Sequence, residues 1–227
     1  MYKAIFFDRD GTLTYFNPEK EKWRNNTIEN WSGKPFELSY EKMTELFKKA
    51  SERKKPWYKI VEDEREFFKR YYRHLLLNEG IEDEIEKRTI RLFNELWCNN
   101  DRLIHTETIE VLEYFKGKDY KMGVISDTSP SLEYTLQQLG LAKYFTSFTA
   151  SSLVGASKPS PIIFNAALDA QKVTASESLY VDDYDVEADG ARDLGFTSFL
   201  IDRSGQNKDK WTINNLKEII KYVEENN

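Results

Sequence analysis

Acidic side chains end two short apolar segments of this chain of 227 residues. Asp8 and Asp10 follow one such segment near the N-terminus, and Asp182 and Asp183 follow another much farther along the chain. Carboxylate oxygens are the hard ligands that Mg²⁺ prefers, and carboxylates also act as nucleophiles and as proton donors or acceptors. The four aspartates are therefore the candidate metal ligands, and Asp8 and Asp10 are also candidates for nucleophilic and acid–base chemistry.

A hydroxyl and an amine follow apolar segments in a similar way. Ser126 follows the pair Val124-Ile125, and Lys158 stands in Gly155-Ala156-Ser157-Lys158-Pro159. A phosphate monoester is a dianion, so an approaching carboxylate is repelled unless a cation lies between them. The Lys158 ammonium supplies a positive charge, and the Ser126 hydroxyl supplies a hydrogen-bond donor for phosphoryl oxygens. This alternation of opposite charges at successive strand ends is typical of a pocket for a phosphate ester.

Taken singly, each of these groups has an ordinary structural interpretation. The first acidic segment could form an Asx turn, Ser126 could cap the helix that follows it, and Asp182-Asp183 could be a charged turn. Lys158 could be a solvated lysine at the start of a helix. A calcium-binding EF-hand loop is excluded, because Gly11 follows Asp10 directly without a third oxygen ligand. Their joint occurrence at successive strand ends favours a reaction centre.

The pattern of apolar residues predicts the elements that must position these groups. Residues 3–7 form a buried strand that ends at the acidic turn, and after residue 106 helices and strands alternate. Such alternation predicts an α/β fold, with a Rossmann-like parallel sheet core and helices on both faces, in which ligands bind beyond the carboxyl ends of the strands. The expected helices are 107–115, 130–139, 159–171 and 188–194, and the expected strands are 120–125, 147–150, 178–181 and 197–201.

The chain between the two parts of this core has a different texture. Residues 62–77 and 81–97 repeat apolar side chains at helical spacing among many charges, whereas residues 15–35 show no pattern that we assign to an element. A helical insert therefore interrupts the predicted core. The expected domains are a catalytic core of residues 1–14 and 106–227 and an inserted alpha-helical cap domain of residues 15–105.

The composition restricts the class of protein. Hydrophobic residues make up 40% of the chain, and the formal net charge is −6, which favours a folded protein and disfavours a nucleic-acid partner. A single cysteine, Cys98, excludes an internal disulfide, and no apolar run is long enough for a signal peptide or a membrane span. We expect a cytoplasmic protein without a nucleic-acid or membrane partner, and the sequence leaves the oligomeric state open.

Four motifs follow one another along the predicted core. They are Phe6-Phe7-Asp8-Arg9-Asp10-Gly11-Thr12-Leu13, Gly123-Val124-Ile125-Ser126-Asp127, Lys158-Pro159-Ser160-Pro161 and Tyr180-Val181-Asp182-Asp183. In this order they resemble the haloacid dehalogenase superfamily, specifically its phosphatase branch with an alpha-helical cap, which includes phosphoglycolate phosphatase-like and β-phosphoglucomutase-like proteins. The resemblance spans nearly the whole core. The second motif is the least specific, because many relatives carry asparagine where Asp127 stands.

The resemblance implies a role for each candidate residue. Asp8 would attack phosphorus and form an aspartyl-phosphate, and Asp10 would protonate the departing alkoxide and then accept a proton from the attacking water. Ser126 and Lys158 would bind the phosphoryl group, and Mg²⁺ would be the cofactor. The substrate would be a small-molecule phosphate monoester. Dehalogenases of this superfamily lack the second aspartate, because a halide needs no proton, so Asp10 favours phosphoryl chemistry.

Some assignments stay open on the sequence alone. Asp182 resembles a paired-acid variant in which both carboxylates approach the metal, and Glu187 either pairs with Lys158 or is an ordinary acid at a helix start. A phosphomutase of the same superfamily would share these site residues, and the intact site disfavours a non-catalytic phosphate-binding regulator. A cysteine phosphatase lacks support because Ile104, not arginine, stands six positions after Cys98. Two widely separated histidines give no support to a zinc enzyme.

The predicted cap carries candidate substrate contacts. The predicted catalytic loop begins at Asp8, and Tyr15, Phe16 and Asn17 follow it. We expect these three residues near the hinge and the mouth of the pocket. Trp57 and Tyr58 either stack on a base or sugar of the substrate or belong to the core of the cap. A basic cluster either steers an anionic substrate or forms a solvated helix face. The cluster comprises Lys48, Lys49, Arg53, Lys54, Lys55 and Lys59.

Overall fold

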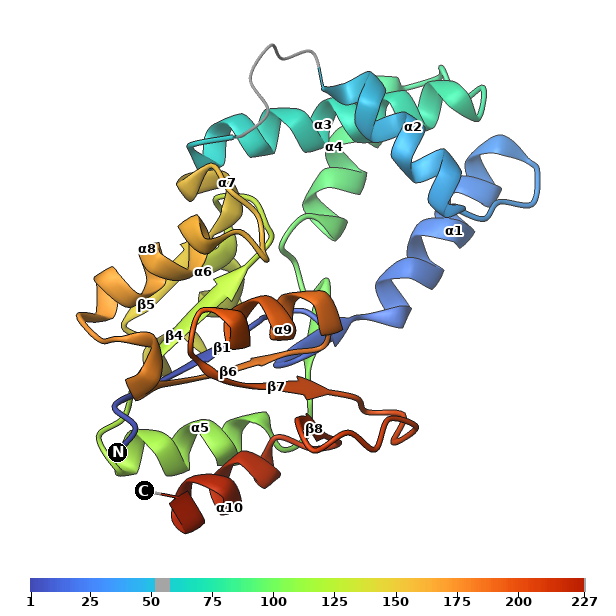
Figure 1. Ribbon diagram of the computed structural model, residues 1–227. Helices are drawn as coiled ribbons and strands as arrows, with labels where there is room; N and C mark the ends of the chain where they lie inside the picture. The colour runs from blue at the N-terminus through green and yellow to red at the C-terminus, as the bar shows by residue number, and fades with distance from the viewer. Residues whose placement is uncertain (52–57, 227) are drawn as a thin grey trace. The chain divides into compact units, whose positions relative to one another are not determined.

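A parallel sheet of six strands forms the centre of the computed structural model, which describes residues 1–51 and 58–226 (Figure 1). Within these residues the strand order is β5-β4-β1-β6-β7-β8, and every adjacent pair is parallel. The expected α/β, Rossmann-like fold is therefore confirmed. The strands are β1 (Ala4–Phe7), β4 (Lys121–Ser126), β5 (Ser147–Ala150), β6 (Ser178–Asp182), β7 (Thr197–Ile201) and β8 (Thr212–Ile213).

Helices cover both faces of this sheet because successive side chains of a strand point to opposite faces. Ile5 and Phe7 of β1 pack in one apolar cluster with side chains of α5, α6 and α10, whereas Ala4 and Phe6 pack in another with α8 and α9. Figure 1 shows α5 and α10 on the opposite side of the sheet from α8 and α9. The helices are α5 (Thr108–Gly117), α6 (Leu132–Gln138), α7 (Ser151–Val154), α8 (Pro161–Gln171), α9 (Asp185–Asp193) and α10 (Lys217–Asn226), with 3₁₀ turns at Ala142–Tyr144 and Ala175–Glu177.

The strand register brings the predicted site residues to one edge of the sheet. Phe7, the last residue of β1, lies opposite Val124 of β4 and Val181 of β6. The residues that follow in each strand or turn, Asp8 and Asp182 among them, therefore leave the sheet side by side at its carboxyl edge.

All four predicted helices of the core begin at residues other than those expected. Helix α5 begins at Thr108 rather than residue 107, and α6 begins at Leu132 rather than residue 130. Helix α8 begins at Pro161 rather than residue 159, and the Ser160 hydroxyl accepts a hydrogen bond from the Ile162 amide as its N-cap. Helix α9 begins at Asp185 rather than residue 188. The acidic residues in its first turn favour a helix there, because their charge complements the positive end of the helix dipole.

The described chain divides into two compact units, residues 1–15 with 103–227 and residues 16–102. The first unit contains the parallel sheet, and it takes in Tyr15 and residues 103–105, which the sequence analysis assigned to the insert. Two short strands, β2 (Thr14–Phe16) and β3 (Arg102–Ile104), pair where the chain leaves this unit and returns to it.

The second unit is helical and has its own apolar core, to which Leu75, Leu76 and Leu92 contribute fully buried side chains. The indole nitrogen of Trp97 donates to the buried Glu64 carboxylate at 3.2 Å. Of the predicted substrate contacts, Arg53, Lys54, Lys55 and Trp57 lie outside the described residues. The helices of this unit are α1 (Pro18–Ser32), α2 (Tyr40–Ala50), α3 (Val61–Asn78) and α4 (Ile85–Leu96).

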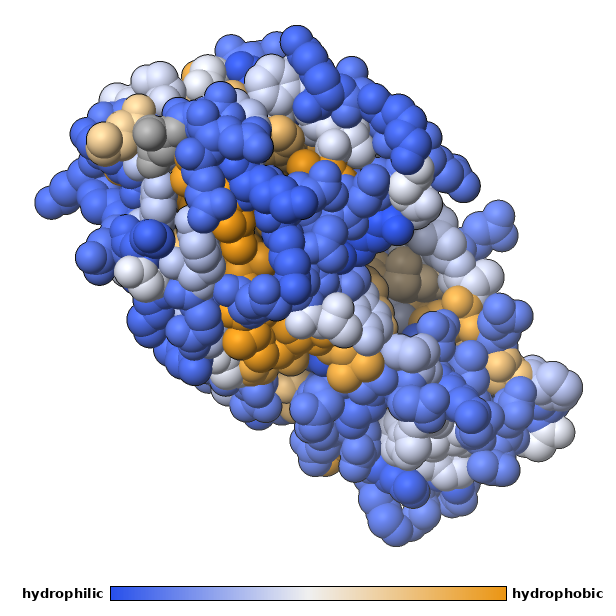
Figure 2. Space-filling view, turned by 90° about the horizontal axis from the view of Figure 1, so that it is seen from below, coloured by the Kyte–Doolittle hydropathy of each residue, from blue (hydrophilic) through white to orange (hydrophobic). Residues whose placement is uncertain are grey.

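Hydrophilic side chains predominate on the face of the molecule in Figure 2, as expected for a chain with 32% charged residues. Among the helices that the structure describes, none combines the length and the apolar character needed to cross a membrane. Apolar side chains are instead concentrated in three buried clusters, one on each face of the sheet and one in the helical unit.

Candidate active site

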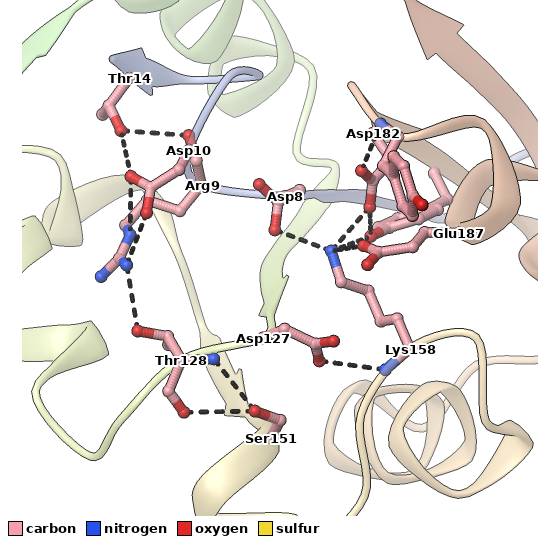
Figure 3. Close-up of polar contacts among 12 residues, drawn as sticks. Asp8, Arg9, Asp10, Thr14, Asp127, Thr128, Ser151, Lys158, Asp182 and Glu187 are labelled. Carbon is pink, nitrogen blue, oxygen red and sulfur yellow. Dashed lines mark hydrogen bonds and ion pairs between the residues drawn. The ribbon is translucent and has the colours of Figure 1, made fainter. Parts of the chain in front are cut away.

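The Lys158 ammonium is the centre of the polar site at the carboxyl edge of the sheet (Figure 3). Its Nζ atom lies 2.8 Å from Asp8 Oδ1, 2.7 Å from Asp182 Oδ2 and 2.6 Å from Glu187 Oε2. It also donates to the Tyr180 hydroxyl at 3.0 Å. Three separate segments therefore bring negative charge to one buried lysine, and Glu187 pairs with Lys158 in the way that the sequence left open.

The surroundings of Lys158 hold it in its charged form. Its side chain is only 1% exposed, and such burial alone would lower the pKa of the amine. The Tyr180 hydroxyl and the three carboxylates outweigh this effect and raise the pKa well above its usual value. A permanently charged, immobilised ammonium is suited to binding a phosphoryl group beside Asp8.

Asp8 lies in the turn directly after β1 and is 6% exposed. One carboxylate oxygen accepts the hydrogen bond from Lys158, and the other points away from the lysine (Figure 3). Burial raises the pKa of Asp8 to about 6, with the nearby Asp182 adding to the rise and Lys158 opposing it. The contact with Lys158 favours the ionised form of this carboxylate, and its second oxygen is turned away from the lysine.

Asp183 is packed against the catalytic loop at Gly11. Gly11 has a φ of +81°, and a Cβ atom at this position would lie 1.9 Å from Asp183 Oδ2. A glycine is therefore required here both for its backbone conformation and for the space that the carboxylate occupies. Burial and, to a smaller extent, the charges of Asp8 and Asp182 together raise the pKa of Asp183 to about 6.

Three of the four predicted metal ligands meet in this site. Carboxylate oxygens of Asp8, Asp182 and Asp183 all lie within 4.8 Å of one another. Hard oxygen donors at this spacing fit a magnesium ion, and burial raises the pKa of all three carboxyl groups, an effect that a bound cation would offset. The donor set therefore fits Mg²⁺, although Asp182 already accepts hydrogen bonds from Lys158 and from the Tyr184 amide.

The Asp10 carboxylate lies apart from this group of three. Its Oδ1 atom accepts hydrogen bonds from Arg9 Nε and from Thr14 Oγ1, each at 3.1 Å. Its Oδ2 atom accepts a hydrogen bond from Arg9 Nη2 at 2.8 Å. Asp10 as a side-chain metal ligand stays a prediction, and its carboxylate is held by other groups.

The end of β4 and the residue after it form another side of the site. Ser126 ends this strand and is 3% exposed. The next residue, Asp127, accepts a hydrogen bond from the backbone amide of Lys158 at 3.0 Å through Oδ1, and burial raises its pKa. Asp127 therefore fixes the segment that carries the lysine, a contact that the sequence analysis did not predict.

Tyr180 is a further site residue that the sequence analysis missed. Its side chain is fully buried, and its hydroxyl donates to Asp182 Oδ2 while accepting from Lys158. The signal for it is the two-residue period of a strand, which places Tyr180 and Asp182 of β6 on the same face.

Arg203 supports the catalytic loop from a distant part of the chain. Its guanidinium donates to the Gly11 carbonyl at 3.1 Å and to the Thr12 carbonyl at 2.6 Å. Glu107, which is 4% exposed, pairs with the same guanidinium at 2.6 Å. Burial alone would raise the pKa of Glu107, but Arg203 lowers it below its usual value. The pair therefore ties the return segment from the insert to the catalytic loop.

A cavity of about 460 Å³ lies beside these groups in the first unit. Gly11 and Asp183 line it together with Tyr15, His105 and Arg203. The rings of Tyr15 and His105 lie 4.9 Å apart at the wall of this cavity. A contact of Tyr15 with the substrate stays a prediction.

Comparison with known proteins gives a family and several relatives. A model of haloacid dehalogenase-like hydrolases matches residues 2–195. A protein named as a phosphatase from Mycobacterium tuberculosis (strain CDC 1551 / Oshkosh) is 26% identical over 91% of this chain and 90% of its own length. A glyceraldehyde 3-phosphate phosphatase from Pyrococcus abyssi (strain GE5 / Orsay) is 28% identical over 81% of this chain and 74% of its own length.

The fold is also similar to solved structures. The crystal structure of a 2-haloacid dehalogenase from Pseudomonas syringae pv. Tomato DC3000 superposes with a TM-score of 0.70 and covers 99% of both chains. The two sequences are 23% identical, so this likeness concerns the fold alone.

Proposed function

We propose a specific reaction for this chain, which belongs to the haloacid dehalogenase-like hydrolase family: the magnesium-dependent hydrolysis of a small-molecule phosphate monoester through an aspartyl-phosphate. The observation that carries this proposal is the contact of the buried Lys158 ammonium with Asp8 Oδ1 at 2.8 Å. It puts a fixed positive charge beside a carboxylate whose other oxygen is turned away from the lysine.

Phosphoryl chemistry is supported over dehalogenation by two observations. The relatives from M. tuberculosis and P. abyssi are both named as phosphatases. Asp10 supplies the second carboxylate that an alkoxide leaving group requires and a halide does not. The chain is accordingly a phosphohydrolase. The dehalogenase that superposes on it is similar in fold alone and gives no support to dehalogenation by this chain.

The proposed reaction consists of two displacements. In the first, Asp8 forms a bond to phosphorus and the ester oxygen departs with a proton from Asp10. In the second, water attacks the same phosphorus, Asp10 accepts its proton, and the bond between Asp8 and phosphorus breaks to release phosphate. Lys158 and Ser126 bind the phosphoryl oxygens in both steps, because their negative charge persists through both transition states.

Asp8 and Asp183 would hold the magnesium ion, with Asp182 as the third member of the carboxylate group. Bound there, the ion supplies positive charge between these carboxylates and the phosphate dianion. Asp182 has a second task in the proposal, because its hydrogen bond to Lys158 orients the ammonium.

The test uses p-nitrophenyl phosphate and two isosteric variants. Asp8→Asn is expected to abolish turnover and Asp10→Asn to lower it by about 10²–10⁴-fold, the usual contribution of acid–base catalysis. Asp169→Asn, the same change at an exposed site in α8, is the control and should leave turnover unchanged. Turnover that survives in Asp8→Asn would refute the covalent mechanism, and full activity in EDTA would refute the metal requirement.

A second assay separates hydrolysis from phosphoryl transfer within the substrate. The protein is incubated with a panel of sugar phosphates, which includes glyceraldehyde 3-phosphate because the P. abyssi relative is named for it. Release of inorganic phosphate supports a phosphatase. An isomerised sugar phosphate without free phosphate would instead identify a phosphomutase.

A further inference from the structure

Arg9 stands between the two candidate catalytic aspartates, and its side chain turns toward Asp10. The residue is 3% exposed, so its charge needs a partner inside the protein. Arg9 Nε donates to Asp10 Oδ1 at 3.1 Å, and Arg9 Nη2 donates to Asp10 Oδ2 at 2.8 Å. Two nitrogens of one planar group thus engage both oxygens of the carboxylate, which fixes its plane as well as its position.

Arg9 is itself held from the other side of the site. Its Nη2 atom also donates to the Thr128 hydroxyl at 3.0 Å. Thr128 is anchored in turn, because its amide donates to Ser151 Oγ at 3.0 Å and Ser151 Oγ donates back to its carbonyl at 3.3 Å. Figure 3 shows this chain of contacts running from Asp10 through Arg9 to Ser151.

A third contact completes the arrangement. Thr14 Oγ1 lies 3.1 Å from both Asp10 Oδ1 and the Arg9 carbonyl, so it can donate to either oxygen. Asp10 remains partly open to solvent, with 28% of its side chain exposed. The carboxylate is therefore oriented by neighbours on one side and accessible to a reacting group on the other.

We propose that Arg9 is a positioning residue for Asp10, and that Thr128 sets the orientation of the Arg9 guanidinium. The inference rests on the proposed role of Asp10 in proton transfer. Arg9 keeps the carboxylate in reach of the departing ester oxygen and couples it to the loop that follows Ser126, the last residue of β4. A substrate-binding role for Arg9 is the competing interpretation, and the two roles affect different kinetic parameters.

The test compares leaving groups that need a proton with one that does not. Arg9→Met, Arg9→Lys and Thr128→Val are assayed with phenyl phosphate and with 2,4-dinitrophenyl phosphate, whose phenolate leaves without protonation. We expect Arg9→Met to lower kcat/KM for phenyl phosphate by about tenfold more than for the dinitrophenyl ester, since proton transfer as a whole contributes about 10²–10⁴-fold. Arg9→Lys keeps the charge without the planar fork and should restore only part of the loss.

Controls distinguish the possible failures. Arg73→Met removes an exposed arginine of the helical unit and should leave kcat/KM unchanged for both esters. If Arg9→Met raises KM equally for both esters, Arg9 binds the phosphoryl group and the proposal is overturned. Circular dichroism checks that each variant folds. If Arg9→Met does not fold, Thr128→Val, which keeps Arg9, provides the test: it should lower kcat/KM more for phenyl phosphate than for the dinitrophenyl ester, by a smaller factor than Arg9→Met. An equal loss for both esters would refute the proposal.

Asp10→Asn separates this inference from the proposed function. If Asp10→Asn shows the dependence on leaving group and Arg9→Met does not, Asp10 transfers the proton and only the role of Arg9 is wrong. If Asp10→Asn itself shows no dependence, the proposed function of Asp10 fails.

Discussion

Replacing the candidate nucleophile by its neutral isostere, Asp8→Asn, is expected to stabilise the metal-free protein at neutral and alkaline pH. The pKa of Asp8 is raised from 3.8 to about 6, chiefly by burial. A group whose pKa is raised in the folded state contributes stability below its unfolded pKa, and that contribution is lost as the pH rises through the folded value. Asparagine carries no charge at any of these pH values.

The shift gives the size of the effect. It amounts to about two pKa units at about 1.4 kcal/mol each, so ionisation of Asp8 lowers the free energy of unfolding by about 3 kcal/mol. The value already contains the attraction of Lys158, which opposes the shift. The pKa of Asp183 is raised as well, but its side chain is exposed and solvent screens its charge. Asp183 therefore adds to the direction of the effect and not to its stated size.

The assay is urea unfolding in EDTA, followed by circular dichroism from about pH 4 to about pH 8. The difference in unfolding free energy between Asp8→Asn and the unmutated protein should be small at the acidic end and should approach about 3 kcal/mol above the pKa of Asp8. Magnesium should reduce or reverse the difference, because it stabilises the protein that retains the carboxylate by mass action. Asp169→Asn serves again as the control.

Two outcomes would contradict this prediction, and each has a different physical cause. If Asp8→Asn is less stable than the unmutated protein at every pH, the hydrogen bond with Lys158 outweighs the burial of the charge. If the difference does not change with pH, Asp8 does not have the raised pKa that its environment implies.

Two further predictions concern the catalytic loop. Gly11→Ala should weaken the apparent magnesium affinity by about 10–100-fold, because the added Cβ atom would displace Asp183. An unchanged affinity in a magnesium titration would contradict this prediction. Gly140→Ala is the control for backbone strain, because Gly140 has a similar φ of +69° but open space around it. Arg203→Met should lower the free energy of unfolding by about 3 kcal/mol in urea titrations, because it removes the cation that pairs with the buried Glu107 carboxylate. An equal loss in Arg73→Met, which removes an exposed arginine, would point to a general surface effect instead.

The limits of prediction from sequence are clearest in particular elements. Strands β5 and β7 have the expected bounds, because each is a short uncharged segment in which Phe and Thr, residues that favour a strand, recur. Helix α1 was not predicted, because only Thr27 and Ile28 of its residues are buried and no apolar stripe marks it. Its ends did carry local signals, since Asn17 caps it and Gly33 ends it in a left-handed conformation.

The contacts of the site divide in the same way. The sequence analysis placed Asp8 and Lys158 at strand ends and in one pocket, but it predicted no contact between them. In the structure Asp8 follows β1, whereas Lys158 lies in the loop between α7 and α8. Contacts that depend on long-range packing were not predictable, such as Arg203 on the carbonyl of Gly11 across 192 positions of the chain. Such a contact depends on how closely two loops approach each other in the folded protein, and no local sequence pattern predicts the distance between them.

By itself, then, the sequence determined the alternation of strands and helices in the core as far as β7, without α7, and the chemical groups at the carboxyl edge of its sheet. It did not predict β8 or α10. These are local properties that can be read along the chain: the periodicity of apolar residues, and the polar residue types that follow each apolar segment. Only the tertiary structure decided which partner each charge takes: Asp10 pairs with Arg9, while Lys158 engages three carboxylates at once. The physical reason is that pairing depends on burial and on distances of a few ångströms, which exist only after the sheet has brought remote segments together.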